Sequence, residues 1–224
     1  MTDITRFKEL LFADQPLDQL LLSAAETDFG EGPWTVLSEA GASIRDGKPD
    51  EAIQLLLKIT AKPDIQTRIL LWSWTTLRGL GVLPDSAGAS EIKGIVIEVP
   101  VSGGIDVLAG YADGTARYIN HSGKIIVWDL PDALVLDLIR KLLECAGILD
   151  APRLSNSAAR STSEVVRVTL LTCGGNRTLY IPMQSLGSGP IKQLLSRGGQ
   201  LMATLIKRTE TMNQLISSSD ESEF

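Results

Sequence analysis

The sequence predicts an α+β protein in which a helical N-terminal section precedes an antiparallel β-meander. Apolar residues recur at helical spacing up to residue 80, and at every second position in strand-like runs within 95–128. The segment between these regions, 81–90, is rich in Gly, Ser and Pro, which is typical of a connector. We therefore expect a helical section at 1–80, a connector at 81–90, an α+β domain with an antiparallel sheet at 91–216 and a disordered acidic tail at 217–224.

Four to five helices are expected in the N-terminal section. Leucines at helical spacing follow Pro16, and proline is favoured in the first turn of a helix. Further helices are predicted from Pro33 to about Arg45 and from Pro49 to just before Pro63. The last one, at 64–79, has apolar side chains most of the way around it, so we expect it to lie centrally in its section.

A helical hairpin is predicted around the turn Asp-Gly-Lys-Pro-Asp-Glu-Ala at 46–52. Gly47 is placed to end one helix and Pro49 to begin the next. The hairpin, over about residues 33–60, resembles a tetratricopeptide-like helical pair. The resemblance implies helical-hairpin packing and covers this part of the chain alone, because no second copy follows at a spacing of about 34 residues.

Four antiparallel strands are predicted between residues 92 and 128, followed by the order αββα, so that the whole domain reads ββββαββα. Turns are predicted at 102–104, 113–114 and 121–123. Asp113-Gly114 predicts a type I′ hairpin turn, in which both central residues have positive φ.

The helices and strands after the meander have equally clear signals. A helix is expected from Pro131 to about Ala146 with Asp129 as its cap, and a polar loop at 151–163 precedes the last two strands. The final helix begins at Gly189-Pro190. Gly198-Gly199 in its interior predicts a close packing contact or a kink, since glycine costs about 1 kcal/mol relative to alanine in a helix.

Composition narrows the function classes. A formal net charge of −6 disfavours binding to nucleic acid or to anionic membranes. We find neither a signal-peptide pattern nor about 18 consecutive apolar residues, and so expect a cytoplasmic protein. Cys145 and Cys173 have neither metal-site nor redox-motif spacing. We therefore expect buried free thiols, no cofactor and no metal.

Three residues are candidates for acid–base chemistry. Glu98 and Asp106 flank the first turn of the meander, and two adjacent carboxylates raise the pKa of one of them. The alternative is that they lie on the solvated face of an edge strand. His121, the single histidine, is either a base that lines a cleft or a solvated turn residue.

Two tryptophans are candidates for partner binding. Trp72 and Trp74 are two positions apart and so point about 200° from each other on a helix. Either one lies in the core while the other seals the helical layer against the sheet, or one faces outwards and anchors a protein partner.

The leading hypothesis is a non-enzymatic, cytoplasmic protein–protein interaction or adaptor module with a protein partner. An acidic, immunity-type inhibitor of a basic toxin or nuclease is one case of it. The alternative is a small-molecule sensor with a pocket between the sheet and the helices at 131–146 and 190–206. A hydrolase that uses Glu98, Asp106 or His121 has the least support.

Overall fold

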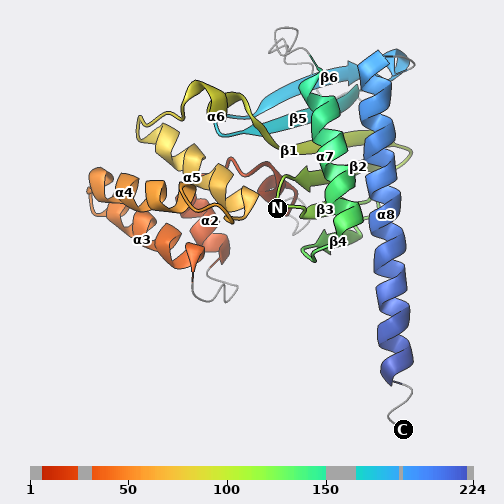
Figure 1. Cartoon of the computed structure of the whole chain (residues 1–224), viewed down its shortest axis with the longest axis horizontal. Helices are drawn as coiled ribbons and strands as arrows, with labels where there is room; N and C mark the ends of the chain where they lie inside the picture. The colour runs from red at the N-terminus through yellow and green to blue at the C-terminus, as the bar shows by residue number, and fades with distance from the viewer. Residues whose placement is uncertain (1–6, 25–31, 150–164, 187–188, 221–224) are drawn as a thin grey trace. The chain divides into compact units, whose positions relative to one another are not determined.

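The computed structural model describes residues 7–24, 32–149, 165–186 and 189–220 (Figure 1). The chain divides into two compact units: residues 1–94 with 169–177, and residues 95–168 with 178–224. The predicted 151–163 loop lies outside the described residues.

The first unit is helical, as the sequence predicts. Its helices are η1 (Leu10–Phe12), α2 (Leu17–Ala24), α3 (Pro33–Arg45), α4 (Pro49–Thr60), α5 (Thr67–Gly79) and α6 (Ser86–Ser90). Prolines begin α3 and α4 as expected, and Gly47, with φ of 72°, ends the turn between them. Helix α6 was not predicted, because it lies within the expected connector; Asp85 caps it by accepting a 2.7 Å hydrogen bond from the N–H of Gly88.

The tip of the hairpin between β5 (Val165–Thr172) and β6 (Arg177–Pro182) belongs to this helical unit and is fixed by hydrogen bonds that involve backbone carbonyls. The N–H of Gly174 donates to the Ala89 carbonyl at 3.1 Å, and the guanidinium of Arg78 donates to the Cys173 carbonyl. The amide of Asn176 donates to the Phe12 carbonyl at 2.9 Å. Residues far apart in sequence are thereby joined around one turn.

A six-stranded antiparallel sheet follows the helices, in the order β4-β3-β2-β1-β5-β6. The strands are β1 (Ile92–Val101), β2 (Gly104–Tyr111), β3 (Ala116–Ile119), β4 (Ile125–Trp128), β5 (Val165–Thr172) and β6 (Arg177–Pro182). In the meander, Val107 pairs with Ile119, which in turn pairs with Ile125. The predicted α+β class and the order ββββαββα are confirmed.

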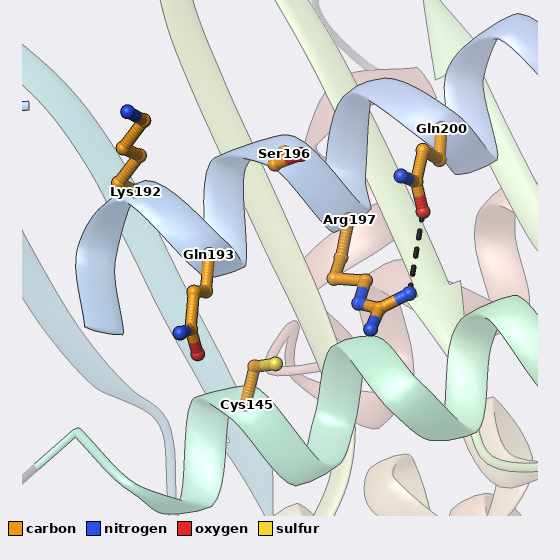
Figure 2. A pocket seen from close by; sticks show the side chains of 6 residues that line it. All are labelled: Cys145, Lys192, Gln193, Ser196, Arg197 and Gln200. Atoms are coloured by element: carbon orange, nitrogen blue, oxygen red, sulfur yellow. Dashed lines mark hydrogen bonds between the residues drawn. The ribbon is translucent and has the colours of Figure 1, made fainter. Parts of the chain in front are cut away.

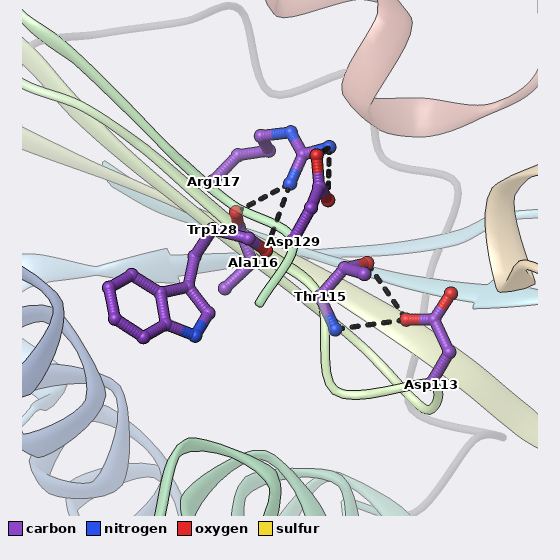
Figure 3. Close-up of polar contacts among 6 residues, drawn as sticks. All are labelled: Asp113, Thr115, Ala116, Arg117, Trp128 and Asp129. Atoms are coloured by element: carbon purple, nitrogen blue, oxygen red, sulfur yellow. Dashed lines mark hydrogen bonds and ion pairs between the residues drawn. The ribbon is translucent and has the colours of Figure 1, made fainter. Parts of the chain in front are cut away.

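The turn between β2 and β3 differs from the predicted type I′. The N–H of Tyr111 bonds to the Thr115 carbonyl at 3.0 Å, so the loop has three residues, Ala112 to Gly114. Gly114 has a φ of 88°, whereas Asp113 is not among the residues with positive φ. This is the pattern of a hairpin closed by a single left-handed glycine. Asp113 accepts hydrogen bonds from the backbone N–H and the hydroxyl of Thr115, at 3.0 and 2.8 Å (Figure 3).

Helices α7 (Ala133–Gly147) and α8 (Gly189–Asp220) lie side by side in the second unit, where the 3₁₀ turn η3 (Met183–Ser185) precedes α8 (Figure 1). The cap of α7 is Asp132, whose carboxylate accepts from the N–H groups of Leu134 and Val135; Asp129, the predicted cap, is three residues too early. Helix α8 continues to Asp220, four residues into the segment expected as a tail.

Asp129 instead pairs with a buried arginine. Arg117, on β3, is 2% exposed, and its Nη2 lies 2.8 Å from Asp129 Oδ1 (Figure 3). Its Nη1 donates to the carbonyls of Ala116 and Trp128, at 2.8 and 3.3 Å. A buried guanidinium needs this degree of pairing, because an unpaired buried charge is costly. Arg117 therefore ties the end of β4 to β3.

Within the described ranges, no helix combines the length and the hydrophobicity needed to cross a lipid bilayer.

Replacing Gly174 with alanine should destabilise the protein, because a Cβ there would lie 2.6 Å from the Ala89 carbonyl oxygen, a rigid backbone atom. We expect a loss of about 1–3 kcal/mol in the free energy of unfolding, measured by urea denaturation. The control is Gly79→Ala, whose Cβ would meet nothing within 4 Å. Equal stability of the two variants would contradict the close approach at Gly174.

Candidate functional site

An apolar cavity of about 290 Å³ lies between the sheet and helix α8 in the second unit. Its walls are side chains of β1, β2, β3 and β5 on one side and of α8 on the other, with Leu186 beside them. The cavity residues are Ile97, Val99, Val101, Asp106, Leu108, Tyr118, Val166, Leu186, Leu195, Gly198, Gly199 and Met202. Ten of these twelve carry no polar side-chain group, so the cavity suits an apolar molecule.

Two glycines of α8, Gly198 and Gly199, form part of the cavity wall. Gly198 faces the sheet, where an added Cβ would lie 3.1 Å from Ile97 Cδ1. An added Cβ at Gly199 would meet nothing within 4 Å. The expected close packing contact is therefore at Gly198. Gly198 thus lets the α8 backbone approach the sheet closely, whereas the space beside Gly199 is open.

Asp106, Tyr118 and His121 form a hydrogen-bonded cluster at the polar end of the cavity. The hydroxyl of Tyr118 donates to Asp106 Oδ2 at 2.9 Å. The backbone N–H of His121 donates to Asp106 Oδ1 at 2.8 Å, and its ring Nδ1 lies 3.1 Å from the same oxygen. Asp106 and Tyr118 line the cavity, whereas His121 is exposed in the turn before β4. The cluster therefore places one carboxylate and one phenol against an apolar space.

The phenol of Tyr118 is held in its neutral form. Burial raises its pKa from 10.0 to about 12, and the hydrogen bond to Asp106 and the charge of that carboxylate act in the same direction. Tyr118 thus stays a hydrogen-bond donor to Asp106 well above neutral pH.

Of the three acid–base candidates, the structure brings Asp106 and His121 together and keeps Glu98 apart. Ile97 and Val99 both line the cavity, so Glu98 between them points to the opposite face of the sheet. There it is buried and forms an ion pair with Arg167 of β5. The adjacent pair of carboxylates, Glu98 with Asp106, is not formed.

The two candidate tryptophans lie in the first unit. Trp72 is 3% exposed, and its ring centroid is 5.8 Å from that of Trp34 in a tilted arrangement. Trp74 is half-buried. Trp72 therefore belongs to the core of the helical unit.

A second, more open groove of about 430 Å³ lies between α7 and α8 and is polar (Figure 2). Cys145 faces Arg197 across it, and Lys192 and Gln193 lie one turn earlier on α8. Arg197 Nη1 donates to Gln200 Oε1 at 3.4 Å. Arg197 extends toward the last turns of α7, where positive charge complements the negative end of the helix dipole (Figure 2). We therefore assign this groove to helix packing.

Sequence reasoning found Asp106 and His121 but missed Tyr118 and the two α8 glycines as parts of one site. Within the described ranges, no three His, Cys, Asp or Glu side chains are grouped so that they could hold a metal ion. Comparison with known protein families, with curated proteins and with solved structures found no match to this chain.

Tyr118 should show the raised pKa in an alkaline titration. We expect a phenol ionisation at about pH 12, followed by ultraviolet absorbance of the phenolate, that is missing in Tyr118→Phe. Because the folded-state pKa lies above the unfolded value, the stability from neutral Tyr118 is complete below pH 10 and is lost as the pH rises toward 12. Asp106→Asn should move the ionisation toward pH 10; an unchanged value would contradict the contact.

Proposed function

We propose that this protein is a small-molecule-binding domain, of the kind found in sensors, that holds an apolar ligand between the sheet and α8. The observation that carries this proposal is the 290 Å³ cavity with one hydrogen-bonding cluster at its end. A mostly apolar pocket with a few convergent polar groups is the usual form of a ligand site.

The size of the cavity limits the ligand. Its volume of about 290 Å³ is close to the lower end of the range for ligand pockets, roughly 300–1,000 Å³. It is about twice the volume of an apolar cavity that holds benzene, roughly 150 Å³. A two-ring or comparably sized aliphatic molecule fits this space.

The burial of the tryptophans weighs against the alternative role as a protein-binding adaptor. The candidate anchors of that role are Trp72 and Trp74, of which Trp72 is buried and Trp74 is half-buried. A partner surface on the helical unit thus lacks its expected anchor, whereas the pocket expected for a sensor has a counterpart beneath α8.

The polar cluster supports binding better than nucleophilic catalysis. The hydroxyl of Ser122, next to His121 in sequence, donates to Asn120 Oδ1 at 2.8 Å and so is directed away from the imidazole. A nucleophile paired with a base needs its hydroxyl directed at the imidazole. We therefore assign Asp106 and Tyr118 to ligand orientation.

Naphthylmethanol, a neutral two-ring alcohol, should bind saturably with a one-to-one stoichiometry in isothermal titration calorimetry. Val99→Phe places a larger ring in the cavity and should weaken binding by about tenfold or more, which corresponds to about 1.4 kcal/mol. The matched control is Val127→Phe on β4, where the valine is 52% exposed and lies outside the cavity.

Both variants should unfold cooperatively, and Val127→Phe should bind as the wild type does. Equal binding by the two variants would refute a ligand site in this cavity.

A further inference from the structure

We propose that the ligand is an apolar amine whose protonated ammonium group binds Asp106 and Tyr118 at the polar end of the cavity. This inference rests on the proposed function and specifies the class of molecule that the cavity takes.

The first argument is the charge of Asp106. Within the described ranges its ion-pair contact is with His121 Nδ1 at 3.1 Å, which carries a positive charge only when the ring is protonated, and no lysine or arginine pairs with it. Its side chain is 21% exposed, and the cavity residues include neither lysine nor arginine. Its polar contacts are the Tyr118 hydroxyl and the backbone and ring of His121. A carboxylate withdrawn from water without a permanent countercharge is costly.

Two other shielded acids in the same unit show the contrast. Glu98, with a side chain 6% exposed, pairs with Arg167. Asp132, at 14%, pairs with Arg208, whose Nε lies 3.2 Å from its Oδ2. Each of these carboxylates therefore has an arginine built into the fold. Asp106 is the shielded acid whose countercharge a ligand can supply.

The second argument is the number of free acceptor positions. A carboxylate has about four lone-pair positions. Oδ1 of Asp106 faces two His121 nitrogens, whereas Oδ2 accepts from Tyr118 alone. The Tyr118 hydroxyl directs its hydrogen at Oδ2 and keeps its oxygen lone pairs as acceptors. Two acceptor atoms thus converge at the end of an apolar space, and an ammonium group has three donors to offer them.

Other ligand classes fit this end of the cavity less well. A carboxylate or phosphate would meet the charge of Asp106, and the described part of the chain places no lysine or arginine in the cavity wall to offset the repulsion. A neutral alcohol can donate one hydrogen bond but leaves the charge uncompensated. The expected order of affinity is therefore amine, then alcohol, then acid.

A series of three naphthalene ligands tests this order by calorimetry at neutral pH and low salt: naphthylmethylamine, naphthylmethanol and naphthoate. We expect the amine to bind the wild type at least about tenfold more tightly than the alcohol, as for a partly shielded charge pair, and naphthoate to bind most weakly. Raising the salt concentration should weaken the amine and leave the alcohol unchanged.

Two variants identify the group responsible. Asp106→Asn should abolish the preference for the amine over the alcohol, since the carboxylate is lost. The matched control, Asp113→Asn, removes an equal charge from the exposed β2–β3 turn, outside the cavity, and should keep the preference. The salt dependence of the wild type gives an independent readout should Asp106→Asn fail to fold.

The outcomes separate this inference from the proposed function. If none of the three ligands binds, both are wrong. If the alcohol binds as tightly as the amine, or naphthoate binds most tightly, the cavity is a ligand site but its ligand is not an amine. A preference for the amine that survives Asp106→Asn and high salt would likewise overturn the role of Asp106.

Discussion

Helix α8 is held against the sheet by leucines placed on either side of a glycine pair. Leu194, Leu201 and Leu205 are fully buried, and between them Gly198 brings the helix backbone close to Ile97. The leucines fix the spacing between helix and sheet. The cavity lies beside this close approach, with Gly199 and the half-buried Leu195 and Met202 in its wall. One packing arrangement thus stabilises the second unit and leaves a hollow, although protein interiors are normally close-packed.

The distribution of charge in the second unit follows a related rule. Buried or shielded ions are tolerated where each has a partner of opposite sign, as Arg117 has Asp129 and Glu98 has Arg167. These pairs are complete within the protein. Asp106 differs because its partners among the described residues are a phenol and an exposed histidine, and this difference is the basis of the proposed ammonium site.

The sequence was sufficient for the architecture, because a change in hydrophobic period is a local signal. It was insufficient where the result depends on one residue of register: Asp113-Gly114 closes a three-residue loop, and Asp132 caps α7 in place of Asp129. The contact of Asp106 with His121 could have been predicted from the sequence. Folding β2 back along β3 at the predicted turn brings residue 106 beside 120–121.

Other features had no sequence signal. The ion pair of Glu98 with Arg167 joins residues 69 apart and requires the neighbouring positions of β1 and β5 in the sheet, which no pattern within either strand specifies. The cavity could not be predicted from the sequence either. Val99 and Val166 alternate in their strands as core residues do, whether the space that they face is filled or empty.

The apolar cavity and the carboxylate of Asp106 have a common thermodynamic consequence for the proposed ligand. The apolar body of that ligand covers the apolar surface of the cavity, and its ammonium group pairs with Asp106. Both contributions add to the affinity. Such a ligand binds the folded state and not the unfolded one. Binding therefore raises the free energy of unfolding of the second unit by RT ln(1 + [L]/Kd). The residues proposed to bind the ligand lie on both α8 and the sheet, so binding would stabilise the contact between them.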